Sequence, residues 1–417
     1  MSPVPLRRNR DFVLLQIGQA LSTTGSESTQ IAFPLLVLAL TGSPAKAGIV
    51  GFARFLPYVV FAIPSGVLVD RRNRRRLMLA ADGGRVLAMA SLVVVLALHV
   101  ATFAQIVVVA LVEGSLYALF NIAETGALQA VVPPQQLPRA AAAEQSRLAA
   151  VQLASAPLGG ALFGLGRLVP FLFDAVSYVF SIGSLLAIRT PFQRVRERGA
   201  TGAWEEVVEG FEWLRGHRFL WAIQLVSAGS NLVFQGLLLA VIVVGRNEGL
   251  TSAQIGLLVA ALSVVLLLGS ITAPWFQHRL SLRTMLLLSL VATLAIGLFV
   301  AWPTVYVLVA ASLPSAFLVP PVAATVIGYR IAIAPEPLVG RINSVARTIA
   351  ISGAPAGSLL AGFLLASLSA KTTVAVLTCC AALLVAWAFA SPSLRESPSL
   401  AELDDVVRPA ASPAATG

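Results

Sequence analysis

Two glutamates stand in parts of the chain that are otherwise apolar, and a carboxyl group in such surroundings can carry a proton. Glu27 lies in the polar run 22–30, which should keep one face of a helix wet, and Glu113 lies among valines, leucines and alanines. A charged side chain inside a membrane-spanning helix is costly and needs a reason to be there. A carboxyl group shielded from water keeps its proton more readily than an exposed one. Glu27 and Glu113 are therefore candidates for a proton-coupled step.

Arg54 and Asp174 are further candidates for the proton-coupled step, and each also has a structural interpretation. Arg54 lies in the next apolar segment, so it could form with Glu27 an ion pair that only stabilises the helices. The two interpretations are compatible, because Arg54 could be the partner of Glu27 whenever that carboxylate is ionised. Asp174 lies in a later apolar segment and is interpreted as structural, with a coupling role as the alternative.

A second pair of charges is set three residues apart. Asp82 and Arg85 would share one face of a helix and could interact directly. They follow closely on the most basic segment of the chain. This position favours a structural or gating pair over a substrate site.

That basic segment, residues 66–75, separates two long apolar runs. It contains Gly66, Asp70, Arg71, Arg72, Asn73, Arg74 and Arg75. The segment is too polar to enter a bilayer and too short to be a domain. It predicts a tight turn between two membrane helices, held in the cytoplasm by its arginines.

The composition indicates a membrane protein throughout. The chain is 57% hydrophobic and 12% charged over 417 residues, with a mean hydropathy of +0.86. One span needs about 20 apolar residues, so the chain has room for about a dozen helices. The net charge of +10 is concentrated in alternate loops, which favours membrane topology over nucleic-acid binding. Three histidines and the adjacent Cys379 and Cys380 form no ligand cluster, so neither a metal site nor a cofactor is expected.

The apolar runs predict twelve spans in two sets of six. They fall near 12–40, 46–69, 77–98, 103–125, 141–165 and 168–189, and then near 219–244, 252–276, 284–302, 304–328, 345–368 and 372–391. The predicted division is a cytoplasmic N-terminus (1–11), a first bundle (12–189), a linker (190–218), a second bundle (219–391) and a disordered tail (392–417). The excess of arginine in one set of loops places both termini in the cytoplasm.

The two halves repeat each other, and a distinct helix is expected between them. Residues 43–48 and 251–256 open corresponding spans at an offset of 208, and the same offset relates Arg71 to Arg279 and Arg75 to Arg283. Such parallel repeats enclose a substrate site between the bundles in transporters. In the linker, residues 204–214 place aromatic and aliphatic side chains opposite glutamates. This pattern predicts an amphipathic helix on the membrane surface or against the bundles, with a simple tether as the alternative.

The basic segment resembles the signature loop of the major facilitator superfamily, Gly-x3-Asp-Arg-x-Gly-Arg-Arg. Asn73 stands at the usual second glycine, and asparagine also tolerates a left-handed turn. Further fragments resemble the branch of macrolide and enterobactin exporters. They are residues 25–43, 82–85, 173–178, 340–345 and 353–358. The resemblance implies an all-α membrane protein with twelve transmembrane helices in two six-helix bundles.

The same resemblance implies what the protein does. It implies a bacterial inner-membrane exporter of small amphipathic molecules that works by alternating access, often by proton antiport, with the proton gradient in place of a cofactor. A monomer is the default, with substrate and lipid bilayer as partners. Residues 156–161, Ala-Pro-Leu-Gly-Gly-Ala, depart from the antiporter pattern Gly-Pro-x-x-Gly-Gly. This departure affects the expected coupling and leaves the expected fold unchanged.

Gating roles also follow from the resemblance. In the family, the acid of the signature loop caps the eleventh transmembrane helix, a role that Asp70 would fill. A loop arginine pairs with an acid at the inner end of the fourth helix, which would place Glu124 opposite Arg71 or Arg75. Arg74 belongs to the same loop. The alternative is that these arginines set topology alone.

The substrate cavity is expected to be mostly apolar, with a few hydrogen-bonding side chains. The candidates are Gln30, Asn231, Gln235, Ser312 and Ser315. Two alternatives to an exporter remain: a facilitator or symporter for a nutrient, and a receptor or assembly factor that transports nothing. The polar run around Glu27 argues against the latter, because a scaffold gains nothing by burying it. No nucleophile–base pair, metal constellation or Gly-x4-Gly-Lys-Ser/Thr loop is present, so neither an enzyme nor an ATP-driven pump is expected.

Overall fold

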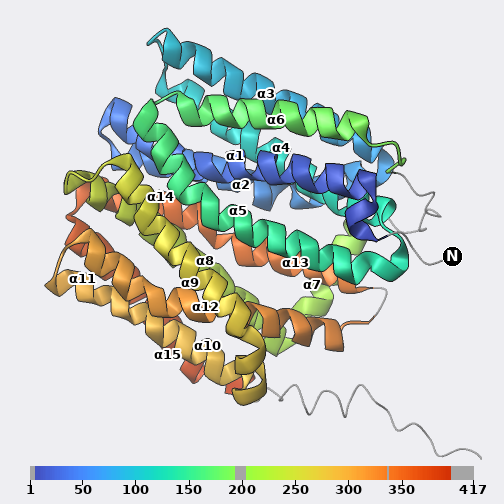
Figure 1. Ribbon diagram of the computed structural model, residues 1–417. Helices are drawn as coiled ribbons and strands as arrows, with labels where there is room; N and C mark the ends of the chain where they lie inside the picture. The colour runs from blue at the N-terminus through green and yellow to red at the C-terminus, as the bar shows by residue number, and fades with distance from the viewer. Residues whose placement is uncertain (1–4, 193–202, 336–337, 396–417) are drawn as a thin grey trace, which may run out of the picture.

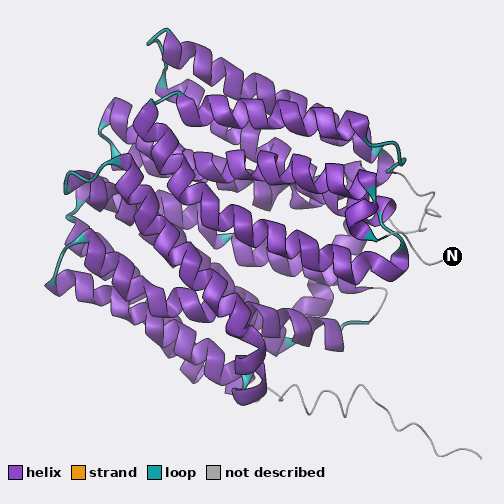
Figure 2. Ribbon diagram, viewed as in Figure 1, coloured by secondary structure: helices purple, strands orange, loops and turns teal. Residues whose placement is uncertain are grey.

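The computed structural model describes residues 5–192, 203–335 and 338–395, and these residues are helical with short connections (Figures 1 and 2). The first half contains α1 (Arg10–Thr41), α2 (Pro44–Arg71), α3 (Arg74–Ala97), α4 (Phe103–Val131), α5 (Leu137–Leu165) and α6 (Val169–Ala187). The second half contains α8 (Arg218–Asn247), α9 (Ser252–Arg279), α10 (Leu282–Thr293), α11 (Leu298–Ala301), α12 (Val305–Ile333), α13 (Val339–Ile351), α14 (Gly353–Ser367) and α15 (Ala370–Ala390). The short helices η1 (Leu6–Arg8), η2 (Pro134–Gln136), η3 (Leu294–Gly297) and α16 (Pro392–Arg395) lie at their ends, and α7 (Ala203–Gly216) lies between the halves.

Within the described residues, these helices form twelve long stretches, one for each predicted span. Helices α10 and α11 make one stretch because η3 joins them. Helices α13 and α14 make another because α13 runs directly into α14. Ten of the stretches are long and apolar enough to cross a membrane, and α1 and α2 run beside them as helices of 32 and 28 residues. The predicted all-α fold of two six-helix bundles is therefore confirmed.

The helices start and stop where the sequence provides caps. The side chains of Asn9, Thr102, Thr251, Ser281 and Ser369 each accept a hydrogen bond from a backbone N–H in the first turn of the following helix. Such caps satisfy donors that a helix leaves unpaired. Several helices run past the predicted span ends: α4 reaches Val131 and α12 reaches Ile333. The predicted ends mark where the apolar run stops, whereas backbone hydrogen bonding continues into the polar layer.

Asn73 has a different role from the expected one. Its φ is −66°, which is not left-handed, and its side chain accepts a hydrogen bond from the N–H of Arg76. Asparagine therefore replaces glycine here as the N-cap of α3, a position for which it is strongly preferred.

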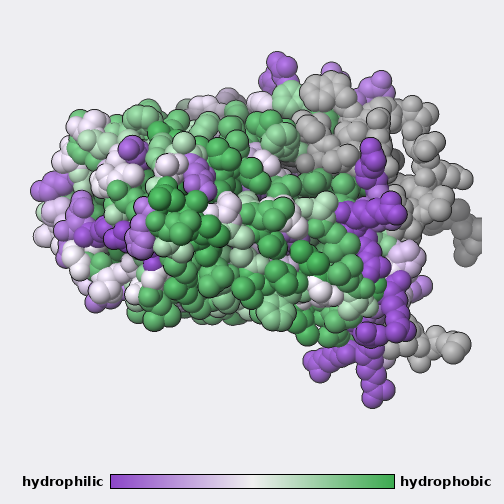
Figure 3. Space-filling view, turned by 90° about the horizontal axis from the view of Figure 1, so that it is seen from above, coloured by the Kyte–Doolittle hydropathy of each residue, from purple (hydrophilic) through white to green (hydrophobic). Residues whose placement is uncertain are grey.

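The two halves lie side by side, with the blue-to-green helices above the yellow-to-red ones in Figure 1. They meet along α2 with α14 and along α5 with α9. Both ends of the described chain and the α2–α3, α4–α5 and α9–α10 connections lie at one end of the molecule, here called the basic end. The opposite end, which carries the α1–α2, α5–α6, α8–α9 and α14–α15 connections, is called the distal end. Figure 3 shows a hydrophobic middle between two hydrophilic ends, as a membrane protein requires.

The linker helix α7 packs against α13 and α8 at the basic end. Leu214 is fully buried there, and Glu209 forms an ion pair with Arg341 of α13. In the described residues α7 therefore lies against the second half, with Leu214 on its buried face and Glu209 on its exposed face.

Candidate functional site

Arg85 is at the centre of a buried polar cluster in the first half. Its Nη2 atom lies 3.2 Å from Glu113 Oε1 of α4, and its Nη1 atom lies 3.3 Å from Asp82 Oδ1. The same Nη2 donates hydrogen bonds to Ser26 Oγ at 2.6 Å and Tyr178 OH at 2.7 Å. Only 1% of the Arg85 side chain is exposed. The charge thus ties together α1, α3, α4 and α6.

Arg54 closes the other side of this cluster. Its Nε atom lies 3.3 Å from Glu113 Oε2, and its Nη2 donates to the Ser26 carbonyl oxygen at 2.6 Å. Its Nη1 donates to Thr29 Oγ1 at 3.3 Å. Glu113 is therefore held between Arg54 and Arg85, so its two oxygens bind two different helices.

Asp174 joins the cluster through Tyr178 on its own helix. The Tyr178 hydroxyl donates to Asp174 Oδ2 at 3.0 Å, and Thr29 Oγ1 donates to the same oxygen at 3.4 Å. The Arg85 guanidinium also lies over the Tyr178 ring, 3.9 Å from its centroid. Asp174 thus shares hydrogen-bonding partners with both arginines.

Glu27 lies at the edge of the cluster and is only partly buried. It is close enough to Arg54, Glu113 and Tyr117 to interact with each of them. Among the described residues, the carboxylate in direct contact with Arg54 is that of Glu113. Glu27 is thus more accessible to solvent than the other acids of the cluster, and it lies in the same electrostatic field.

The cluster contains more acids than bases. Arg54 and Arg85 face the carboxyl groups of four residues, Glu27, Asp82, Glu113 and Asp174. An excess of negative charge in a medium of low dielectric is unfavourable, and binding of protons relieves it. Protonation of one or two of these acids would therefore reduce the charge imbalance of the cluster.

Asp82 and Arg85, predicted to be a structural or gating pair beside the basic segment, belong to this cluster. The expected direct interaction between them is present. Arg85 is additionally shared with Glu113, which sequence spacing could not reveal because it depends on how α3 packs against α4.

Glu124 is engaged in a separate pair nearer the basic end. Its Oε1 lies 2.8 Å from Arg147 Nη2 of α5, and Arg147 Nη1 donates to Thr23 Oγ1 at 3.4 Å. The expected partner was Arg71 or Arg75, but Arg75 Nη2 instead donates to the Leu186 carbonyl oxygen at 2.6 Å. In this conformation Glu124 therefore links α4 to α5.

The rest of the basic segment is described in part. Arg74 packs over Gly126 and donates to its carbonyl oxygen at 3.4 Å. The side chains of Asp70 and Arg71, like residue Gly66, lie outside the described side chains. The capping role of Asp70 therefore stays a prediction.

The halves touch at the distal end through pairs of glycines. A Cβ on Gly48 of α2 would lie 2.5 Å from the carbonyl oxygen of Ser358, and one on Gly362 of α14 would lie 2.7 Å from Gly48 Cα. Across the other contact, a Cβ on Gly256 of α9 would lie 2.7 Å from the Ala156 carbonyl oxygen and 3.1 Å from Gly160 Cα. Gly48 and Gly256 are related by the 208-residue repeat, so the two closures are equivalent.

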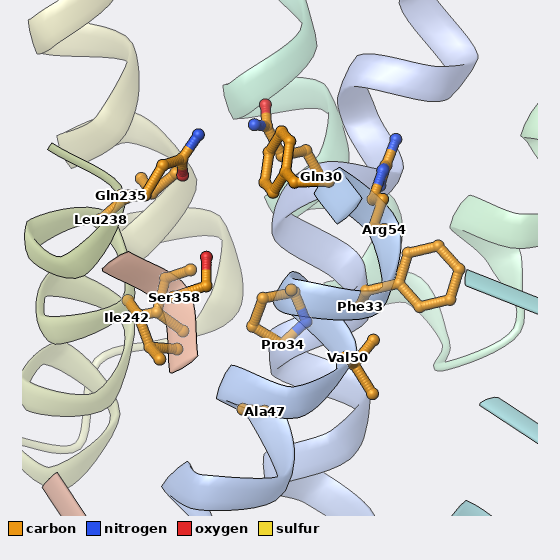
Figure 4. Close-up of a pocket in the computed structure, with 13 residues that line it drawn as sticks. Gln30, Phe33, Pro34, Ala47, Val50, Arg54, Gln235, Leu238, Ile242 and Ser358 are labelled. Carbon is orange, nitrogen blue, oxygen red and sulfur yellow. The ribbon is translucent and has the colours of Figure 1, made fainter. Parts of the chain in front are cut away.

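A small cavity of about 30 Å³ lies just inside this distal contact (Figure 4). Its polar lining comes from Gln30 and Arg54 of the first half and Gln235 and Ser358 of the second. Two predicted cavity residues, Gln30 and Gln235, thus line one space between the halves. Arg54 connects that space to Glu113.

A larger cavity of about 260 Å³ lies within the second half. The three other predicted cavity residues, Asn231, Ser312 and Ser315, line it together with Phe234. The predicted polar wall is therefore divided between two spaces.

Sequence reasoning missed three polar side chains of these sites: Ser26, Tyr178 and Arg147. Arg147 lies within a predicted span, so the cost of a charge in a membrane could have identified it. Ser26 lies within the polar run 22–30, where nothing separates it from its polar neighbours, and a tyrosine such as Tyr178 is common in membrane helices.

The fold and the buried cluster define a multi-pass membrane transporter. The model of the Major Facilitator Superfamily matches residues 15–251, and the chain belongs to that family. It is accordingly a transporter and not an enzyme.

Relatives and solved structures agree with this assignment. Multidrug efflux pump Tap of Mycolicibacterium fortuitum is 28% identical over 408 residues, which cover 93% of this chain and 97% of that protein. Macrolide efflux protein A of Streptococcus pyogenes is 28% identical over 222 residues, which cover 52% of this chain and 54% of that protein. The structure of a bacterial homologue of the iron transporter ferroportin in its inward-facing state matches with a TM-score of 0.72 at 17% identity, over 93% of this chain and 99% of the other, and shows the shared fold.

Proposed function

We propose that this protein is a secondary-active exporter of small amphipathic molecules, driven by proton antiport across the bacterial inner membrane. The observation that carries the proposal is the position of Arg54. It lines the cavity between the halves and also binds Glu113 in the acid-rich cluster. A change of protonation in the cluster is therefore adjacent to the space that a substrate would cross.

The coupling we propose follows from this contact. When Glu113 or Glu27 takes up a proton, its attraction for Arg54 is lost, and the guanidinium is held less strongly in the cluster. When the acid is ionised, it holds Arg54 against α1 and α4. Protonation thus changes the contacts of an arginine that lines the space between the halves, which would couple proton binding to the passage of substrate.

The distal contacts support a cycle of alternating access. With Gly48 against Gly362 and Gly256 against Gly160, the distal end is closed, so this conformation would face the side of the basic end. Arginine-rich loops favour the cytoplasm, which would place both termini there. Rocking of the halves would separate the glycine pairs and expose the cavities to the opposite side.

Export is the direction supported by the relatives, whose names describe efflux of multiple drugs and of macrolides. The large cavity supports an amphipathic cargo, because its lining is mostly aliphatic and aromatic. A facilitator or symporter for a nutrient would use the same fold, and the two are separated by the direction of net transport.

Replacement of Glu27 by Gln is expected to abolish the part of efflux that depends on the proton gradient. The amide keeps the size of the side chain and cannot bind or release a proton. The measurement is efflux of lipophilic dyes and antibiotics from cells that express the chain, with and without an uncoupler. Glu212→Gln, on the exposed face of α7, is the matched control and should leave efflux unchanged.

Two outcomes would count against the proposal. If efflux is insensitive to the uncoupler and to Glu27→Gln, antiport is excluded and Glu27 is a structural residue. If the dyes accumulate in expressing cells instead of leaving them, the direction is that of a nutrient carrier.

A further inference from the structure

The larger cavity lies mostly inside the second half. Its walls come from α8, α9, α10, α12 and α15, and one residue, Gln152 of α5, comes from the first half. The polar residues that line it are Gln152, Ser230, Asn231, Ser289, Thr293, Ser312 and Ser315. What these side chains offer to a ligand depends on which of their hydrogen atoms are already in use.

Three hydroxyl groups donate their single hydrogen within their own helices, and Asn231 donates one of its two amide hydrogens there. Asn231 Nδ2 donates to the Ser227 carbonyl oxygen at 3.0 Å, and Ser312 Oγ donates to that of Leu308 at 2.7 Å. Ser315 Oγ and Thr293 Oγ1 each donate to a backbone carbonyl oxygen at 2.9 Å.

A hydroxyl group has one donor, so the free capacity of these hydroxyls is as acceptors. Asn231 adds a carbonyl oxygen that can accept and keeps one amide hydrogen that can donate. These four side chains therefore offer a ligand more acceptors than donors.

The lack of charged side chains in the described lining further limits the kinds of ligand that can bind. None of the nineteen described residues that line the cavity is an aspartate, glutamate, lysine, arginine or histidine. An ammonium group would leave water without meeting a counter-charge, which is costly within a membrane. A neutral donor meets the acceptors without that cost.

We propose that this cavity binds neutral amphipathic molecules that present hydroxyl or amide N–H donors to Asn231, Ser312 and Ser315. Their apolar part lies against Phe234 and Leu262, and Gln152 reaches the ligand from the other half. This inference rests on the proposed function, because it names the cargo of the same transporter. It places recognition of cargo in the second half, apart from the protonatable cluster of the first.

Binding of a matched series of small probes to the purified full-length chain tests the inference. The series is 1-adamantanemethanol, its methyl ether and 1-adamantanemethylamine, which share one apolar body and differ in donor and charge. Affinity is read from the rise in thermal midpoint with ligand concentration in nanodiscs, followed by tryptophan fluorescence. The alcohol should bind about two- to tenfold more tightly than the ether, because the ether has no donor, and more tightly than the ammonium.

Asn231→Leu should remove the preference for the alcohol, and Ala316→Phe, which fills the cavity, should remove binding of all three probes. Asn121→Leu is the matched control. Asn121 makes the same hydrogen bond to the carbonyl oxygen four residues earlier, also at 3.0 Å, and does not line the cavity. The control should keep the preference.

Equal binding of alcohol and ether, tighter binding of the ammonium, or binding that survives Ala316→Phe would each overturn the inference. The test is independent of transport. A preference for the alcohol without uncoupler-sensitive efflux would support this site and refute antiport, whereas efflux without the preference would do the reverse.

Discussion

Gly256→Leu is expected to abolish transport without preventing folding or membrane insertion. A Cβ at this position would lie 2.7 Å from the carbonyl oxygen of Ala156 and 3.1 Å from Gly160 Cα, so α5 and α9 would have to separate. Backbone cannot move aside as a flexible side chain can. Loss of the distal closure should trap the halves apart at that end.

The measurement combines efflux with a distance across the distal end. Spin labels at residues 46 and 368, in a background without Cys379 and Cys380, report the separation of α2 from α14. Gly256→Leu should lengthen that distance. Gly164→Leu, on α5 with nothing within 4 Å of its added Cβ, should transport normally. Normal transport by Gly256→Leu would mean that the glycine contacts are not part of the cycle.

Replacement of Arg85 is expected to be the most destabilising single change in the first half. Arg85→Leu would leave Glu113 and Asp82 without the charge that both of them contact. Breaking a buried ion pair by removal of one partner costs about 3–5 kcal/mol. Arg85→Lys should also lower the stability of the protein, because one ammonium group cannot reproduce the hydrogen bonds that a planar guanidinium makes to several partners.

The thermal midpoint of the purified protein measures this loss. Arg215→Leu, at an exposed position of α7, is the control and should cost less than about 1 kcal/mol. If Arg85→Leu is as stable as the control, the cluster does not hold the first half together. A stable but inactive variant would show that the arginine serves transport alone.

The arrangement of spans could be predicted from the sequence because hydropathy acts locally. Each apolar run needs about 20 residues to cross the bilayer, and the arginines mark one set of loops. The ends of α4 and α12 could not be predicted in this way, because helical hydrogen bonding extends beyond the apolar run. The role of Asn73 was misjudged because asparagine is suited both to a left-handed turn and to an N-cap, and only the backbone decides between them.

The sequence predicted the site only as a set of charged residues whose burial in a membrane is energetically unfavourable. Each acid within a span could be identified singly, since burial of a charge has a cost that the sequence reveals. Which charges meet depends on helix packing, so the sharing of Glu113 between Arg54 and Arg85 emerged only from the structure. The same holds for Glu124, whose contact with Arg147 depends on how α5 packs beside α4.

Proton movement in proteoliposomes tests the central claim most directly. Purified protein is reconstituted with a pH indicator inside the vesicles, and a substrate dye is added outside with no pH gradient imposed. Coupled exchange predicts that dye entry drives protons out, so the interior becomes alkaline, and that Glu113→Gln removes this signal. Dye entry with no change in internal pH, in vesicles shown to be tight to protons, would contradict proton antiport.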